Sequence, residues 1–143
     1  DGFQSAQRYE CGPDARAPFL AVYRLRDPDV MTSENYTSKA GRNSVDPAFR
    51  AKMTNWDRNL VHGDIESMDV PDGSSMVLID RHTPDSPALP DGFTPLEIVG
   101  LDATIVQRGV RIVPDGDAIA PDTPGEGWTV RTFRPIHAPR HPG

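Results

Sequence analysis

Stretches in which apolar and polar residues alternate dominate the chain, and this period of two residues is typical of β-strands. The alternation predicts five strands, at 3–9, 19–26, 59–68, 75–82 and 128–134. A further strand-like region at 98–113 contains Gln-Arg-Gly at 107–109, which predicts either a hairpin turn or a bulge. The strand at 19–26 begins with apolar residues on both faces, a pattern that indicates a central position in its sheet.

A helical pattern is confined to residues 31–57, between these strand-like stretches. The first short helix is predicted to start with Thr32 as its N-cap and to end at Gly41. A second helix is predicted from Asp46-Pro47, with Asp as the cap and Pro at the first helical position. Its apolar residues recur at helical spacing and predict a stripe that packs on the sheet: Phe49, Met53 and Trp56.

Turn residues interrupt the second half of the chain. Pro-Asp-Gly triplets occur at 71–73, 90–92 and 114–116. Each triplet predicts a turn, because Pro presets one backbone angle, Asp forms local hydrogen bonds and Gly accepts a positive φ. The Pro-rich stretch at 83–90 is predicted to be a loop, and residues 137–143 are predicted to be a frayed tail.

Composition narrows the class of protein. The 143 residues are enough for one ordinary domain, but apolar residues make up only 36%, and 12 Gly and 15 Pro predict a thin core with many turns. A net charge of −6 argues against binding to nucleic acid or to an anionic membrane. The single cysteine, Cys11, cannot form an internal disulfide, and no apolar run approaches a membrane span, so we predict a cytoplasmic protein.

Three blocks in the first half follow a characteristic order: Gly2-Phe3 to Arg8-Tyr9, Phe19 to Tyr23, and Val30 to Ser33 followed by Tyr36. Their order resembles the dimeric α+β barrel superfamily, and the EthD-like members above all. The resemblance implies an α+β fold, with a ferredoxin-like domain over 1–70 that lacks its first strand and helix. Residues 71–136 would then form a β-rich second half, a degenerate copy of the first or an extension.

The same resemblance implies a function and a partner. Members of the superfamily act on aromatic or polyketide-like compounds, so it implies a cofactor-independent enzyme that uses proton transfer, as a lyase, isomerase, cyclase or monooxygenase. It also implies a homodimer, to which the strands from Phe19 and Asn59 would contribute their open edges. The alternative is a non-catalytic accessory subunit that completes its fold with another chain.

Candidate catalytic residues follow from the same arrangement. Tyr9 and Tyr23 lie on the more apolar faces of adjacent predicted strands, where two phenols could hold a small aromatic ligand. His62 could act as the general base on the neighbouring strand of the ferredoxin-like order, because imidazole exchanges protons near neutral pH. The alternatives are ordinary core packing for the tyrosines and a partly exposed polar strand face for the histidine.

Other reactive residues give weaker patterns. Asp80 and His82 are two residues apart on a predicted strand, so the carboxylate could orient the imidazole, or the pair could simply end the strand. Pro139 separates His137 from His141 and argues against a helical metal-binding pair. No metal and no cofactor are therefore predicted.

Overall fold

The computed structural model describes residues 2–12, 17–38, 46–50, 57–64, 69–114 and 125–141. These residues form seven strands: β1 (Phe3–Glu10), β2 (Phe19–Leu25), β3 (Asn59–His62), β4 (Ser74–Arg81), β5 (Thr94–Leu101), β6 (Gln107–Pro114) and β7 (Trp128–Pro135). They also form three short helical segments: the 3-10 helix η1 (Pro28–Thr32) and the α-helical turns α1 (Glu34–Thr37) and α2 (Pro47–Arg50).

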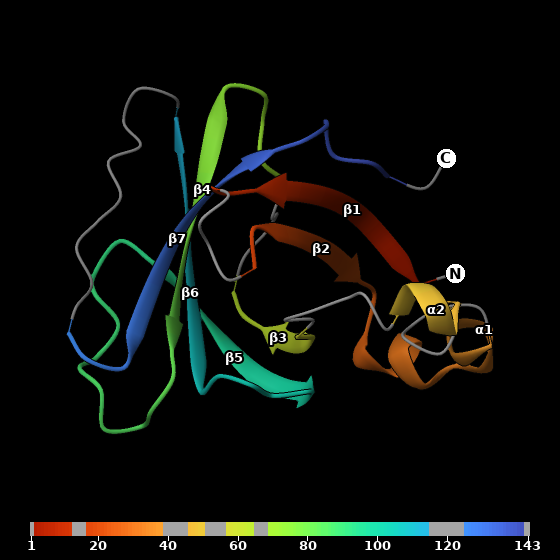
Figure 1. Ribbon diagram of the computed structural model, residues 1–143, viewed down its shortest axis with the longest axis horizontal. Helices are drawn as coiled ribbons and strands as arrows, with labels where there is room; N and C mark the ends of the chain where they lie inside the picture. Colours follow the sequence, from red (N-terminus) through yellow and green to blue (C-terminus); the bar gives the residue numbers. More distant parts are fainter. Residues whose placement is uncertain are drawn as a thin grey trace.

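All seven strands belong to one sheet in the order β2-β1-β7-β4-β6-β5-β3, and every neighbouring pair is antiparallel. The sheet curls, so that β1 and β2 extend from one side of the central strands and β5 and β3 from the other (Figure 1). The first strand pairs with the last, with Tyr9 and Glu10 of β1 opposite Pro135 and Arg134 of β7. Arg140 continues this pairing through two backbone hydrogen bonds with Ala6, of 2.8 and 2.9 Å, so this part of the predicted tail is held on the sheet.

The central strand β4 is buried on both faces, which explains its nearly continuous apolar sequence. Met76 and Leu78 point into the concave side of the sheet. There they meet one contiguous apolar core: Tyr9, Val70, Leu96, Val110 and Phe133. The sheet curls over this core, and none of the described helical segments contributes a residue to it.

The convex face of the central strands is covered by the Pro-rich segment that follows β4. Gly109 on β6 illustrates how close this cover lies, since a Cβ atom there would approach Leu89 to 2.6 Å and Ile79 to 2.8 Å. The indole N–H of Trp128 also donates a 2.7 Å hydrogen bond to the carbonyl of Pro87. The prediction of a loop at 83–90 is therefore confirmed, and this loop is a packed part of the structure.

The predicted α+β, ferredoxin-like architecture of a dimeric α+β barrel, as in EthD-like proteins, is wrong. The described residues form a curled antiparallel sheet, and their helical segments are four or five residues long. Strands from Phe3, Phe19 and Asn59 were expected to be neighbours, yet β2 and β3 lie at opposite edges of the sheet. The strand from Phe19 is accordingly an edge strand, and the prediction of a central position is also wrong.

Local chemistry explains where the described α-helical segments begin. Ser33, and not Thr32, caps α1, because its Oγ accepts a hydrogen bond from the backbone N–H of Tyr36. Ser and Thr compete for backbone hydrogen bonds and favour caps over helix interiors. Asp46 caps α2 as predicted, through a 2.8 Å bond from the N–H of Ala48. The side chain of Phe49, and residues Met53 and Trp56, lie outside the described part of the chain.

Two of the predicted turns have the expected backbone geometry, and the interruption predicted at 107–109 does not form. Gly73 and Gly92 have φ angles of 80° and 91°, as the Pro-Asp-Gly triplets predict. The predicted interruption at 107–109 is wrong, because β6 runs without a break through these residues. The reversal between β5 and β6 lies at 102–106, where Leu101 and Ala103 adopt positive φ angles without a glycine to signal it.

Candidate functional site

Tyr9 is fully buried in the concave core on β1, and its hydroxyl donates a 2.7 Å hydrogen bond to Oε1 of Gln7. Burial raises the pKa of the Tyr9 phenol, and the negative charge of Asp69 raises it further. The phenol therefore stays neutral and occupied as a hydrogen-bond donor. These surroundings agree with the core-packing alternative for this residue.

Gln7 organises the polar contacts around Tyr9. Its amide nitrogen donates to the carbonyls of Val70 (2.9 Å) and His137 (3.0 Å). Its amide oxygen accepts from Tyr9 and from the backbone N–H of Val70 (2.9 Å). A buried amide with all these partners links β1 to the segment before β4 and to the segment after β7.

The structure does not bring the three predicted site residues together. Tyr23 lies on the convex face of β2, half-exposed, with its ring 5.7 Å from that of Phe3, whereas Tyr9 lies on the concave face of β1. His62 is exposed on β3, opposite Glu97, at the other edge of the sheet. The expected common face is thus absent, because β2 and β3 are separated by the other five strands. A general-base role for His62 stays a prediction without a supporting contact.

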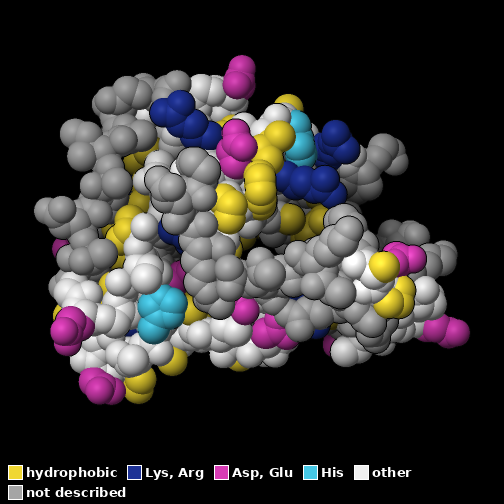
Figure 2. All heavy atoms as spheres, in the orientation of Figure 1, with side chains coloured by type: hydrophobic (Ala, Val, Ile, Leu, Met, Phe, Trp, Pro, Cys, Tyr) yellow, Lys and Arg dark blue, Asp and Glu magenta, His cyan; other side chains and the backbone are white. Residues whose placement is uncertain are grey.

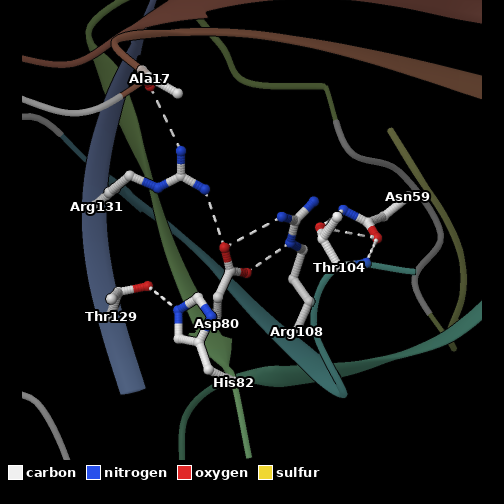
Figure 3. A network of polar contacts seen from close by, with 8 residues as sticks. All are labelled: Ala17, Asn59, Asp80, His82, Thr104, Arg108, Thr129 and Arg131. Carbon is white, nitrogen blue, oxygen red and sulfur yellow. Dashed lines mark hydrogen bonds and ion pairs between the residues drawn. The ribbon is translucent and has the colours of Figure 1, made fainter. Parts of the chain in front are cut away.

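Asp80 makes a different partnership from the one expected. It is buried on the concave side and binds two arginines: Arg108 contacts both carboxylate oxygens, at 2.7 and 3.1 Å, and Arg131 contacts Oδ2 at 2.9 Å. His82 instead lies 2.9 Å from the hydroxyl of Thr129 (Figure 3). The predicted Asp80–His82 pair is therefore not formed.

The Arg108–Asp80–Arg131 cluster joins the three central strands β6, β4 and β7. Arg131 also donates a 3.5 Å hydrogen bond to the carbonyl of Ala17, next to the start of β2 (Figure 3). Sequence reasoning missed both arginines, although a signal was present: each sits at an inward position of an alternating strand, where an ion needs a buried counter-ion. We interpret this cluster as a structural feature that holds the three central strands together.

The remaining candidates do not build a reactive centre. Cys11 is a free thiol that lines a shallow hollow beside Phe19, together with Glu10, Pro18 and Arg134 among others. Within the ranges that the structure describes, no three His, Cys, Asp or Glu side chains gather in a way that could hold a metal ion. None of the described helices is long and apolar enough to cross a membrane.

β2 forms one edge of the sheet, and this edge exposes apolar side chains. β2 has one neighbouring strand in the sheet, β1, and its other side is unpaired by any described strand. The carbonyl of Pro18 accepts a 2.8 Å bond from the N–H of Cys11, the residue after β1. The direction of the backbone N–H and C=O groups alternates along an antiparallel strand. The backbone groups of Leu20 and Val22 therefore also point towards β1, whereas those of Phe19, Ala21 and Tyr23 point towards the open edge.

The side chains on this edge are apolar and exposed. Phe19 exposes 69% of its surface and Tyr23 exposes 52%, with Ala21 between them on the same convex face. On the face of the molecule in Figure 2, the described hydrophobic side chains gather in small groups among charged ones. An unpaired backbone with exposed aromatic side chains is the combination that favours pairing with another strand.

In comparisons with known proteins, no family model, curated protein or solved structure matches the chain.

Proposed function

We propose that this protein is a non-catalytic binding subunit that adds an extended strand of another polypeptide to the β2 edge of its sheet. The observation that carries the proposal is the open, apolar edge formed by Phe19, Ala21 and Tyr23. Strand addition of this kind takes its affinity from backbone hydrogen bonds and its specificity from pockets for alternate side chains.

A pocket of the required kind lies next to the edge. The shallow hollow beside Phe19 combines apolar walls, such as Pro18, with the cross-strand pair Glu10 and Arg134. A side chain of the added strand that lies opposite Phe19 would project from the same face, because paired residues of neighbouring strands share a face. An aromatic ring with a polar tip suits this mixed lining.

Proline substitution tests the role of the backbone. Ala21→Pro removes an N–H that faces the open edge, and proline is tolerated at such edge positions of a sheet. Ala88→Pro, in the exposed part of the Pro-rich loop, is the matched control. Ten-residue peptides selected from a displayed random library should bind the wild-type protein and the control, but not Ala21→Pro.

The site of binding can be read from NMR spectra. The selected peptides should shift the backbone amide signals of Phe19, Ala21 and Tyr23 more than those of Asn59–His62 on β3. If no library peptide binds at millimolar concentration, or if bound peptides leave the β2 amides unchanged, the proposed function is wrong.

A further inference from the structure

We infer that the strand which occupies the β2 edge is β2 of a second copy, paired antiparallel about a twofold axis at Ala21. This inference rests on the proposed function, because it names the partner of the same edge. A twofold axis makes an interface self-complementary, so each residue must suit the residue that the symmetry places opposite it. The sequence of β2 meets this condition when the axis lies at Ala21.

The Ala21-centred register pairs like with like on both faces of the sheet. On the convex face, Phe19 of one copy lies opposite Tyr23 of the other, twice, with the two Ala21 residues in contact between them. On the concave side, Leu20 lies opposite Val22, again twice. Aromatic and aliphatic cross-strand pairs of this kind stabilise antiparallel sheets.

Backbone geometry is consistent with the same register. Phe19, Ala21 and Tyr23 direct their N–H and C=O groups to the open edge, as the Cys11–Pro18 hydrogen bond implies. Pairing 19 with 23 and 21 with 21 therefore gives hydrogen-bonded pairs only. Ala6 on β1 lies beside Tyr23 and leaves room for the aromatic pair on the convex face.

Charge is compatible with this arrangement and excludes two of the alternatives. Arg24 is the only charged residue of β2. An in-register parallel pairing, or an antiparallel pairing centred on residue 24, would place two Arg24 side chains opposite each other, which destabilises a sheet. With the axis at Ala21, Arg24 lies opposite Pro18 instead, and no two charged side chains of β2 face each other.

In this arrangement the second copy lies against Phe19, the β2 residue that also lines the hollow. Tyr23 of the second copy lies opposite Phe19 and carries the aromatic ring with a polar tip that suits the lining of the hollow. The paired segment is short, since seven residues extend roughly 23 Å. Its contact area is therefore below that of a standard stable interface, and we expect a weak dimer that forms only at high protein concentration.

Sedimentation equilibrium between 10 µM and 1 mM tests the dimer under reducing conditions. The average mass of the wild-type protein and of Ala88→Pro should rise from one copy towards two, while Ala21→Pro should stay at one copy and remain folded, with only a small fall in melting temperature. A wild-type protein that stays monomeric at 1 mM overturns the inference. If library peptides still bind its β2 edge, the proposed function stands with a different partner.

Cross-linking tests the register. In a Cys11→Ser background, the variants Phe19→Cys and Tyr23→Cys should form a disulfide when they are mixed and oxidised, because residues 19 and 23 lie opposite each other. Each variant alone should stay largely uncross-linked. Cross-links between two copies of Phe19→Cys, or a dimer that survives Ala21→Pro, would contradict the Ala21-centred pairing.

Discussion

The two edges of the sheet are built differently. β3 has four residues, and its first residues are tied to the turn after β5. There the N–H of Arg58 donates to Oδ2 of Asp102 at 2.8 Å, and the side chain of Asn59 bonds to Thr104. The β3–β5 pairing also shifts register between Leu60 and Val61. By contrast, β2 has seven residues, regular backbone alternation and two exposed aromatic side chains.

The difference shows how an edge is protected and how it is left available. A short strand, a register shift and side chains that bond to the end of the strand are devices that discourage edge-to-edge pairing. β3 uses all three, and β2 uses none of them between Phe19 and Tyr23. Because both edges belong to one sheet, the contrast points to β2 as the edge that binds.

The largest expected effect comes from the support beneath the β2 edge. Gln7→Leu removes four hydrogen bonds and leaves polar groups of Val70, Tyr9 and His137 without this partner. Because an unsatisfied buried group costs roughly 1–3 kcal/mol, we expect the free energy of unfolding to fall by about 3–5 kcal/mol. Urea unfolding measures this loss.

Gln4→Leu is the matched control, because Gln4 is exposed on the same strand. It should change stability by less than about 0.5 kcal/mol. Hydrogen exchange in Gln7→Leu should accelerate in β1 and β2 before it does so in β3. A loss below about 1 kcal/mol, or equal acceleration at both edges, would show that Gln7 does not support the β2 side in particular.

A second, smaller effect separates the two sides of the β2 backbone. Val22→Pro removes an N–H that faces β1, so it breaks a ladder bond and leaves a β1 carbonyl without a partner; we expect a loss of about 2–4 kcal/mol. Ala21→Pro, one residue away, should cost less than about 1 kcal/mol, since its N–H faces the open edge. Equal losses in thermal or urea unfolding would mean that the assigned alternation is wrong.

Alternation alone was enough to locate most strands. The predicted strands at 3–9, 75–82 and 128–134 match β1, β4 and β7 to within one residue at each end. Each of these strands has a clear turn signal beside it or a strong apolar run. The turn between β5 and β6 was missed because its positive φ angles fall on Leu101 and Ala103, which carry no turn signature.

The order of the strands in the sheet could not be predicted from the sequence. Pairing of β1 with β7 joins residues that lie more than a hundred positions apart, and no local pattern encodes it. Apolar residues on both faces of β2 suggested a central strand, but a strand that is apolar on both faces can equally be an edge that binds a partner. The predicted site failed for the same reason, since Tyr9, Tyr23 and His62 converge only if their strands are neighbours.

Removing the protection of β3 should give a smaller effect. Asp102→Ala removes the hydrogen bond from the N–H of Arg58 and the ion pair with its side chain, at 3.7 Å. Both groups are partly exposed, so we expect a loss of about 1 kcal/mol. Hydrogen exchange should accelerate in Asn59–His62 and stay unchanged in β2. Glu97→Ala, on the exposed side of β5, is the control, and an equal effect in this variant would contradict a protecting role for Asp102.

The last effect appears only at alkaline pH and begins beneath β2, where Tyr9 lies beside Leu20. Burial raises the pKa of Tyr9 above the ordinary value of about 10, which the unfolded chain retains. Below pH 10 the phenol is neutral in both states, and its contribution to stability is fully present. As the pH rises above 10, the unfolded state loses a proton that the folded state keeps, so the free energy of unfolding should fall by about 1.4 kcal/mol per pH unit. Urea midpoints between pH 9 and 11 measure this slope.

Tyr9→Phe starts from a lower stability, because it loses the bond to Gln7, but it should lack this part of the slope. Parallel curves for the two proteins would show that the phenol ionises as readily in the fold as outside it.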